Sequence, residues 1–94
     1  MITISDFDFV APTSRQIISA RTALLWSQQD LADKAGVSFT TVRRVETEER
    51  GELSVSKVKP QYVSKIVQAL KDGGITFLAD DDGNVGIMFS RRLR

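Results

Sequence analysis

The sequence contains no cysteine and no histidine among its 94 residues. Without cysteine the chain can form no disulfide bond and no thiolate metal site. Without histidine it lacks the commonest general base and the commonest metal ligand. We also find no nucleophile–base pair, no phosphate-binding loop and no metal-ligand spacing. The sequence therefore predicts a protein that is not an enzyme and that holds no cofactor or metal.

Long apolar runs and a strong charge of either sign are missing as well. No stretch approaches the roughly 18 apolar residues that a membrane span needs. The first ten residues, MITISDFDFV, show no basic start and no unbroken apolar stretch, so they do not predict a signal peptide. We expect a soluble cytoplasmic protein. The net charge is only +1, so any nucleic-acid binder of this composition must gather its basic residues on one face.

The length suits one domain with a marginal core, which dimerisation would extend. Hydrophobic periodicity and capping residues predict helices at residues 14–25, 28–35 and 39 to 47 or 49, and a fourth that begins at Pro60 and stops at Gly73. The charged stretch 48–59 is predicted to be a surface loop with a frayed helical turn. We divide the chain into an N-terminal arm (1–12), a helical domain (13–72), a hairpin (73–90) and a basic tail (91–94).

Apolar residues alternate on both sides of a turn near the end of the chain. Asp82, Gly83 and Asn84 separate the two alternating runs, which predicts a β-hairpin. In the arm, Ile2 and Ile4 favour a short edge strand. The fold class is therefore mainly α, with four or five helices and a C-terminal β-hairpin.

Residues 27–47 have the shape of a helix-turn-helix motif. Two short helices are joined by a tight turn at Gly36, and Ala32 is small enough for close helix packing. In the second helix Val42 marks the buried face, whereas Thr40, Arg44 and Thr47 point away from it and Arg43 lies near the edge. Such a face can enter the major groove, where arginine binds guanine or phosphate and threonine contacts base edges.

The run SQQDLADKAGVSFTTVRRVE resembles the helix-turn-helix of the lambda repressor and Cro superfamily, also called the xenobiotic-response-element family. The whole of residues 15–78 resembles small bacterial and phage regulators. The linker 47–59 departs from this resemblance, because it is longer and more acidic than the resemblance leads us to expect. The resemblance implies base contacts, contacts with the DNA backbone or flanking bases, and a structural ion pair. The residues that would contact bases are Phe39, Thr40 and Arg44. Those that would contact the DNA backbone or flanking bases are Gln28, Ser38, Thr41, Arg43 and Thr47. The ion pair joins Arg21 and Glu46.

Several of these positions have an alternative role. Phe39 lies only about 60° from Val42 on the helix, so it could pack on the domain or at a dimer contact instead of reading a base. Gln28 could bind phosphate or support the second helix of the motif. Trp26 is expected in the core, and the acidic residues 80–82 in a solubilising turn rather than a calcium loop. Lys57, Lys59 and the arginines of the tail are either DNA contacts or solvated charges.

The hairpin poses a separate question, because an isolated two-stranded hairpin is marginally stable in water. Its apolar face could be covered by the first and fourth helices, by the N-terminal arm, or by the hairpin of a second chain. We expect the last of these and a homodimer that sets two motifs on one side of the DNA. The predicted dimerisation residues are Ile75, Phe77, Val85, Ile87 and Phe89.

Taken together, these features predict a sequence-specific, nucleoid-associated DNA-binding protein. We expect a homodimeric repressor or activator that reads a palindromic operator of its own or a neighbouring operon with residues 38–48. The alternative is an adaptor or antitoxin-like module that uses the same fold to bind a partner protein, such as a second regulator. The near-neutral net charge and the acidic segment 46–52 favour that alternative.

Overall fold

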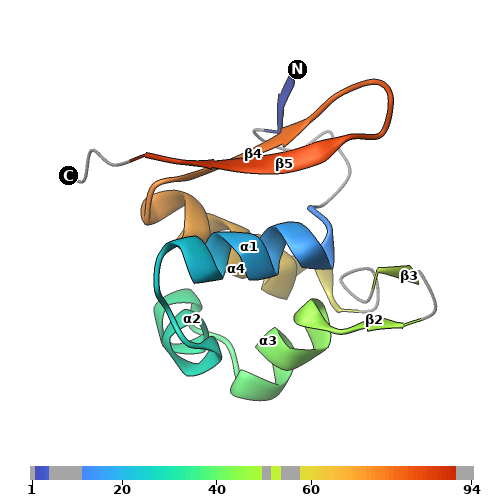
Figure 1. The fold of residues 1–94 in the computed structure, drawn as a ribbon. Helices are drawn as coiled ribbons and strands as arrows, with labels where there is room; N and C mark the ends of the chain where they lie inside the picture. The colour runs from blue at the N-terminus through green and yellow to red at the C-terminus, as the bar shows by residue number, and fades with distance from the viewer. Residues whose placement is uncertain (1, 5–11, 50–51, 54–57, 91–94) are drawn as a thin grey trace.

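A computed structural model of the chain describes residues 2–4, 12–49, 52–53 and 58–90. In this part of the chain four helices lie beneath a small antiparallel sheet, as Figure 1 shows, and the prediction of a mainly helical fold with a C-terminal hairpin is confirmed. Lys57, for which a DNA contact and a solvated charge were both left open, lies outside the described residues, as do the basic tail at 91–94 and most of the arm. The elements are β1 (Ile2–Ile4), α1 (Ser14–Ala23), α2 (Gln28–Ala35), α3 (Phe39–Glu46), β2 (Glu48–Glu49), β3 (Glu52–Leu53), α4 (Pro60–Asp72), β4 (Ile75–Ala79) and β5 (Val85–Phe89).

Side-chain caps fix where the first three helices begin. Ser27 and Asp30 form a capping box at the start of α2, in which each side chain bonds the backbone N–H of the other residue. Ser38 caps α3 by accepting a hydrogen bond from the backbone N–H of Thr41. In α4 Pro60 occupies the first turn, where its missing N–H costs nothing.

The first helix ends two residues earlier than the sequence predicts. After Ala23 the chain makes two closing bonds, from the N–H of Leu25 to the carbonyl of Thr22 and from the N–H of Trp26 to the carbonyl of Arg21. This pattern is a Schellman motif, which needs a left-handed residue after the cap. Leu25 takes that conformation, with φ of 61°. The apolar periodicity had predicted that this residue would still be helical.

The segment after α3 also differs from its prediction. The backbone leaves the helix in an extended conformation at Thr47, and β2 then pairs antiparallel with β3, so the predicted helical turn is wrong there. The helix had been expected to continue to Thr47 or Glu49, but it ends at Glu46. One cause is local, because the Thr47 hydroxyl donates to the carbonyl of Arg43 at 2.8 Å and closes the last turn.

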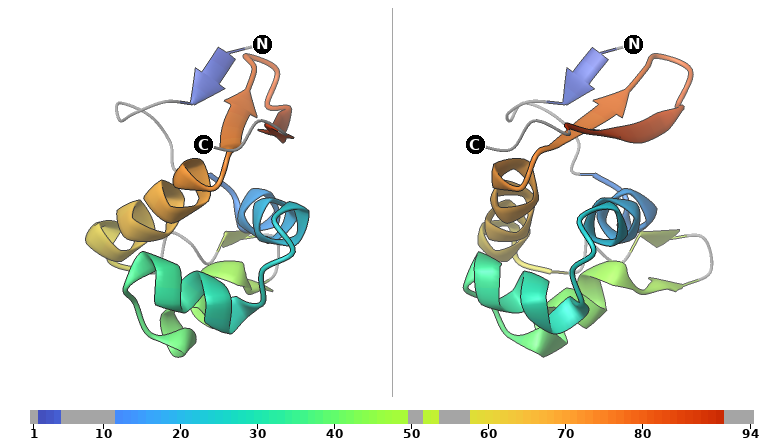
Figure 2. Two further views of the ribbon diagram at one scale, coloured as in Figure 1. Left: turned by 90° about the vertical axis from the view of Figure 1, so that its left-hand side faces the viewer. Right: turned by 60° about the vertical axis from the view of Figure 1, so that its left-hand side comes forward.

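The sheet has the order β1-β4-β5, with both pairs antiparallel. The predicted hairpin is β4 and β5, and the predicted edge strand near the N-terminus is β1. Figure 2 shows that α1 and α4 lie directly under the sheet, while α2 and α3 lie on the side of the helical layer away from it. The motif helices are therefore remote from the sheet.

The core fills the space between the helices and one face of the sheet. Ile75 and Phe77 point into it from β4 and are almost completely buried within the chain, while the assignment of the hairpin to a dimer interface stays a prediction. Their cover comes from the chain's own helices, because α1 contacts β5 and α4 contacts β4. The buried apolar residues are Ile17, Ala20, Leu31, Ala32, Val42, Val45, Val63, Ile66, Ala69, Leu70, Ile75 and Phe77.

Candidate nucleic-acid interface

Helix α3 has one buried face and one exposed face. Val42 and Val45 are fully buried against the rest of the core, which fixes the rotation of the helix about its axis. The opposite face is open to solvent. Its exposed side chains are Phe39, Thr40, Arg43, Arg44 and Thr47. The structure thus brings the predicted base-contacting residues together on one exposed surface with Arg43 and Thr47, and we call these five residues the α3 face.

Two side chains on the α3 face lie close to each other. The guanidinium carbon of Arg43 is 5.9 Å from the centroid of the Phe39 ring, at the outer limit of a cation–π contact. Phe39 is 39% exposed, so it is neither a core residue nor a fully solvated one. The ring therefore keeps part of its surface open to solvent while the arginine lies over its face. The α3 face therefore combines two arginines with a partly exposed aromatic ring.

The hydroxyls of Ser38 and Thr41 are occupied by the helix cap. Ser38 accepts from the Thr41 N–H at 3.1 Å, and the two hydroxyl oxygens are 2.9 Å apart. Thr41 is half-buried, whereas Ser38 is exposed. A hydroxyl in such a pair keeps lone-pair or donor capacity for a phosphate. The cap thus presents these two residues at the N-terminus of α3, beside the α3 face.

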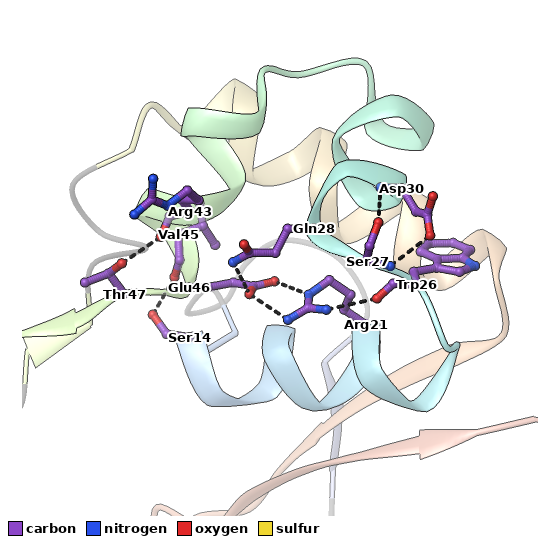
Figure 3. A network of polar contacts seen from close by, with 10 residues as sticks. All are labelled: Ser14, Arg21, Trp26, Ser27, Gln28, Asp30, Arg43, Val45, Glu46 and Thr47. Atoms are coloured by element: carbon purple, nitrogen blue, oxygen red, sulfur yellow. Dashed lines mark hydrogen bonds and ion pairs between the residues drawn. The ribbon is translucent and has the colours of Figure 1, made fainter.

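A buried ion pair holds α3 against α1, as Figure 3 shows. The Arg21 guanidinium donates to both carboxylate oxygens of Glu46, from Nε at 2.7 Å and from Nη2 at 3.1 Å. Its Nη1 atom donates to the carbonyl of Trp26 at 2.9 Å. The Glu46 side chain is only 5% exposed, so this bidentate contact provides the charge and the hydrogen bonds that a desolvated carboxylate needs.

Gln28 completes this network from α2. Its side-chain nitrogen donates to Oε1 of Glu46 at 3.0 Å, so three helices meet at one carboxylate (Figure 3). Two roles were expected for Gln28, phosphate binding and support of the second helix of the motif. This contact corresponds to support of α3. A second contact between α1 and α3 lies at the other end of α1, where the buried Ser14 hydroxyl donates to the carbonyl of Val45 at 2.6 Å. The Arg21–Glu46 ion pair and this hydrogen bond together fix the position of α3 relative to α1.

The turn between α2 and α3 depends on one glycine. Gly36 has φ of 72°, a conformation that an L-residue with a side chain adopts at a cost. Its N–H and that of Val37 both donate to the carbonyl of Ala32, which ends α2 and turns the chain. Leu31 and Ala32 are buried on the α2 side of this turn. The two helices therefore meet with the small-residue packing that the motif requires.

Comparison with protein families gives a match over this same region. The family model described as Helix-turn-helix matches residues 17–59, which is 43 of the 94 residues. Residues 17–59 are a helix-turn-helix of the lambda repressor-like type. The matched helix-turn-helix segment runs from within α1 to the residue before α4, so it includes the Arg21–Glu46 pair and the α3 face. Comparisons with curated proteins and with solved structures returned no match.

One buried polar residue beside the helix-turn-helix segment, Gln16, has a structural role that the sequence did not predict in full. Gln16 is buried and makes hydrogen bonds to Thr13, Leu78 and Gly86. The Thr13-x-x-Gln16 spacing is a capping-box signature, so the local half of this role was visible in the sequence. The contact with the sheet was not, because it joins residues 62 and 70 positions apart.

The described residues offer little for other chemistry. Among them, no group of three acidic residues gathers as a metal site. No helix in this part of the chain is long and apolar enough to cross a membrane. Trp26 is half-buried against the core, as expected, and Lys34 Nζ lies 4.9 Å from the centroid of its ring. Lys59 is exposed and precedes α4.

Proposed function

We propose that this protein is a sequence-specific DNA-binding transcriptional regulator that inserts α3 into the major groove. The observation that carries this proposal is the α3 face itself. Two arginines, two threonines and a partly exposed phenylalanine lie together on a helix whose other face is completely buried. The Arg21–Glu46 pair and the match to the helix-turn-helix family support the same function.

The chemistry of the α3 face suits the edges of base pairs. Arg44 presents a guanidinium that can bond guanine O6 and N7 together, and Thr40 can bond a base edge or touch a thymine methyl. Phe39, which is partly exposed, would contact a thymine methyl with its ring. Arg43 and Thr47, with Ser38 and Thr41 at the cap, would contact phosphates or flanking bases and so set the register.

Gln28 has a supporting role in this proposal. Its amide already bonds the Glu46 carboxylate, so it acts on DNA binding by holding α2 and α3 together. Its backbone N–H lies at the first turn of α2, where the helix dipole favours a phosphate. A Gln28 variant would therefore lower both stability and DNA affinity.

The first experiment is selection of binding sites from random duplex DNA, followed by titration of the selected site. We expect Arg44→Ala to weaken binding to that site by about 1–3 kcal/mol, because a bidentate base contact is lost. Lys71→Ala is the matched control, since it removes one positive charge from the last turn of α4, next to the start of β4 and away from α3 in the chain. Equal affinity of Arg44→Ala and the original protein would overturn the role of Arg44.

Salt dependence separates DNA binding from the alternative of a protein-binding adaptor. Contacts with phosphates release counterions, so the logarithm of the binding constant should fall linearly with the logarithm of salt concentration. If random-sequence selection enriches no site and no duplex is retained at low salt, DNA binding is contradicted and the adaptor function is favoured. A reporter placed downstream of the selected site would then show whether the protein represses or activates.

A further inference from the structure

Phe39 and Arg43 form one flank of the α3 face. They are four residues apart on the helix, so their side chains lie in one row, and the guanidinium of Arg43 lies over the Phe39 ring. Thr40 and Thr47 lie between this row and Arg44, because each residue of a helix is rotated by about 100° from the one before. The α3 face therefore carries its two arginines on opposite flanks, and the ring belongs to the flank of Arg43.

The Phe39 ring is not required by the core. Phe39 belongs neither to the buried cluster nor to the partly buried apolar residues packed against that cluster. It is one of the five large apolar side chains that the described structure leaves exposed. The position of α3 depends instead on the buried residues Val42 and Val45. The ring is therefore available to a ligand of the α3 face.

The Arg43 guanidinium keeps its hydrogen-bond donors. Its contact is with the face of a ring, whereas the five N–H donors of a guanidinium lie in the guanidinium plane. Within the described residues, no hydrogen bond or ion pair occupies these donors. The ring also restricts the conformations of this long side chain, so less entropy is lost when the arginine binds.

The ring and the guanidinium match two groups that neighbour each other in the major groove. The C5 methyl of thymine is an apolar group at the groove edge, and guanine presents its N7 and O6 acceptors there. Adjacent base pairs are about 3.4 Å apart along the duplex axis. A ring that contacts the methyl brings a guanidinium 5.9 Å from its centroid next to the neighbouring base pair, rather than to a phosphate on the wall of the groove.

We propose that Phe39 and Arg43 act together to read a C5-methylated pyrimidine next to a guanine. Phe39 contacts the methyl group, and Arg43 donates to N7 and O6 of the guanine in the adjacent base pair. This inference rests on the proposed function, because it requires α3 in the major groove. It also assigns a guanine to Arg43, for which that function allows either a phosphate or a flanking base.

An apolar ring detects the methyl group and not the identity of the pyrimidine. Thymine and 5-methylcytosine carry the same C5 methyl, and they differ at C4, where thymine presents an oxygen acceptor and cytosine an amino donor. A phenyl ring has no hydrogen-bonding group with which to distinguish them. Phe39 should therefore favour 5-methylcytosine over cytosine about as strongly as thymine over uracil. Methylation of a cytosine at this position raises the affinity of the protein for its site.

Paired duplexes that differ in one methyl group test this inference. In the site selected from random DNA, each thymine next to a guanine is replaced in turn by uracil. In a second pair of duplexes the same position carries 5-methylcytosine or cytosine opposite guanine. We expect loss of the methyl to weaken binding about threefold to fivefold in both pairs, because one buried methyl group is lost. A selected site with no thymine next to a guanine would overturn the proposal.

Phe39→Ala is the diagnostic variant, because it should bring both methyl ratios close to one. Phe89→Ala is the matched control, since Phe89 is also 39% exposed but lies in β5. The control should keep the methyl ratios whatever its overall affinity, and circular dichroism should show that both variants keep their helices. If Phe39→Ala weakens binding equally to duplexes with and without the methyl, Phe39 acts elsewhere, for example at a dimer contact, and the proposal is overturned.

A guanine analogue tests Arg43 in the same assay. Replacement of the adjacent guanine by 7-deazaguanine removes N7 and should weaken binding of the original protein about tenfold, because a charge-assisted hydrogen bond is lost. Arg43→Ala should bind the two duplexes equally, whereas Arg44→Ala, on the other flank of α3, should still distinguish them. If 7-deazaguanine affects Arg43→Ala as much as the original protein, Arg43 does not read this guanine and the proposal is overturned.

The outcomes separate this inference from the proposed function on which it rests. If no duplex is bound, the proposed DNA binding is contradicted and this inference is overturned with it. If a selected site is bound with methyl ratios of one, DNA binding stands and the inference alone is overturned.

Discussion

At the residue scale, Leu25 combines two unfavourable features. Its φ of 61° is a left-handed conformation that favours glycine, and its side chain is 91% exposed. The side chain therefore adds conformational strain without gaining burial. We expect Leu25→Gly to raise the free energy of unfolding by about 0.5–1 kcal/mol, because relief of the strain exceeds the extra entropy of the unfolded chain. Urea denaturation followed by circular dichroism measures the difference.

The control for this prediction is the same substitution at a right-handed position. Thr22 is exposed in the last turns of α1, so Thr22→Gly should lower stability by about 1 kcal/mol instead. If Leu25→Gly is as destabilising as Thr22→Gly, the strain argument is wrong. A stabilised Leu25→Gly variant would also show that the exposed leucine side chain does not contribute to folding.

At the element scale, Gln16 joins the start of α1 to the hairpin. Its Oε1 accepts from the Thr13 N–H at 2.9 Å, while its Nε2 donates to the carbonyls of Leu78 and Gly86 at 3.1 and 2.9 Å. We expect Gln16→Ala to lower the free energy of unfolding by about 2–3 kcal/mol, because the variant loses these three bonds and leaves buried groups unpaired. Gln29→Ala, which removes an exposed glutamine bonded to Asp33, should cost far less in the same urea titration.

The tight turn of the hairpin carries a pH dependence. Hydrogen bonds from the Asn84 side chain and backbone hold the pKa of Asp80 below its ordinary value of 3.8. A carboxyl with a depressed pKa stabilises the fold above its unfolded pKa, and this contribution is lost as pH falls through the folded pKa. We therefore expect NMR titration to place the pKa of Asp80 below 3.8, and Asn84→Ala to move it upward. An unchanged pKa in Asn84→Ala would contradict this assignment.

The contrast between local and distant contacts explains which elements could be predicted from the sequence. The ends of α2 follow from Ser27, Asp30 and Gly36, which act within one turn, and the predicted and observed bounds agree. The end of α1 did not follow, because apolar spacing at Leu24 and Leu25 resembles a continuing helix while the backbone has already turned. The short pairing of β2 with β3 could not be predicted, because these strands show no alternation of apolar and polar residues.

The same contrast holds for the candidate site. The two faces of α3 and the partners Arg21 and Glu46 were predicted, since a helical motif places them by fixed rotation and by resemblance. The cover of the hairpin was not, because alternation shows that Ile75 and Phe77 share an apolar face but not what lies against it. Only the packing of the whole chain distinguishes these two residues from Val85 and Phe89, which remain partly exposed.

At the scale of the whole molecule, the homodimer expected from the sequence and the proposed DNA binding make a joint prediction. Two α3 faces on one side of such a homodimer would read two half-sites spaced by about one helical turn. The dimer neutralises twice as many phosphates in one binding step as a single chain does. Val85 is one of the predicted dimerisation residues, and Val85→Pro removes its backbone N–H without changing any charge. If it separates the two chains, binding of this variant should have a salt slope about half that of the original protein.

Measurement of both slopes on one selected duplex tests this link between the sheet and the DNA. The original protein should bind as a preformed unit, whereas Val85→Pro should bind in two weaker, concentration-dependent steps, since each chain loses the effective concentration that its partner provided. Val85 lies in the sheet, remote from the α3 face, so a direct loss of DNA contacts does not explain such a change. Identical slopes for the two proteins would mean that each α3 face binds DNA independently of β5.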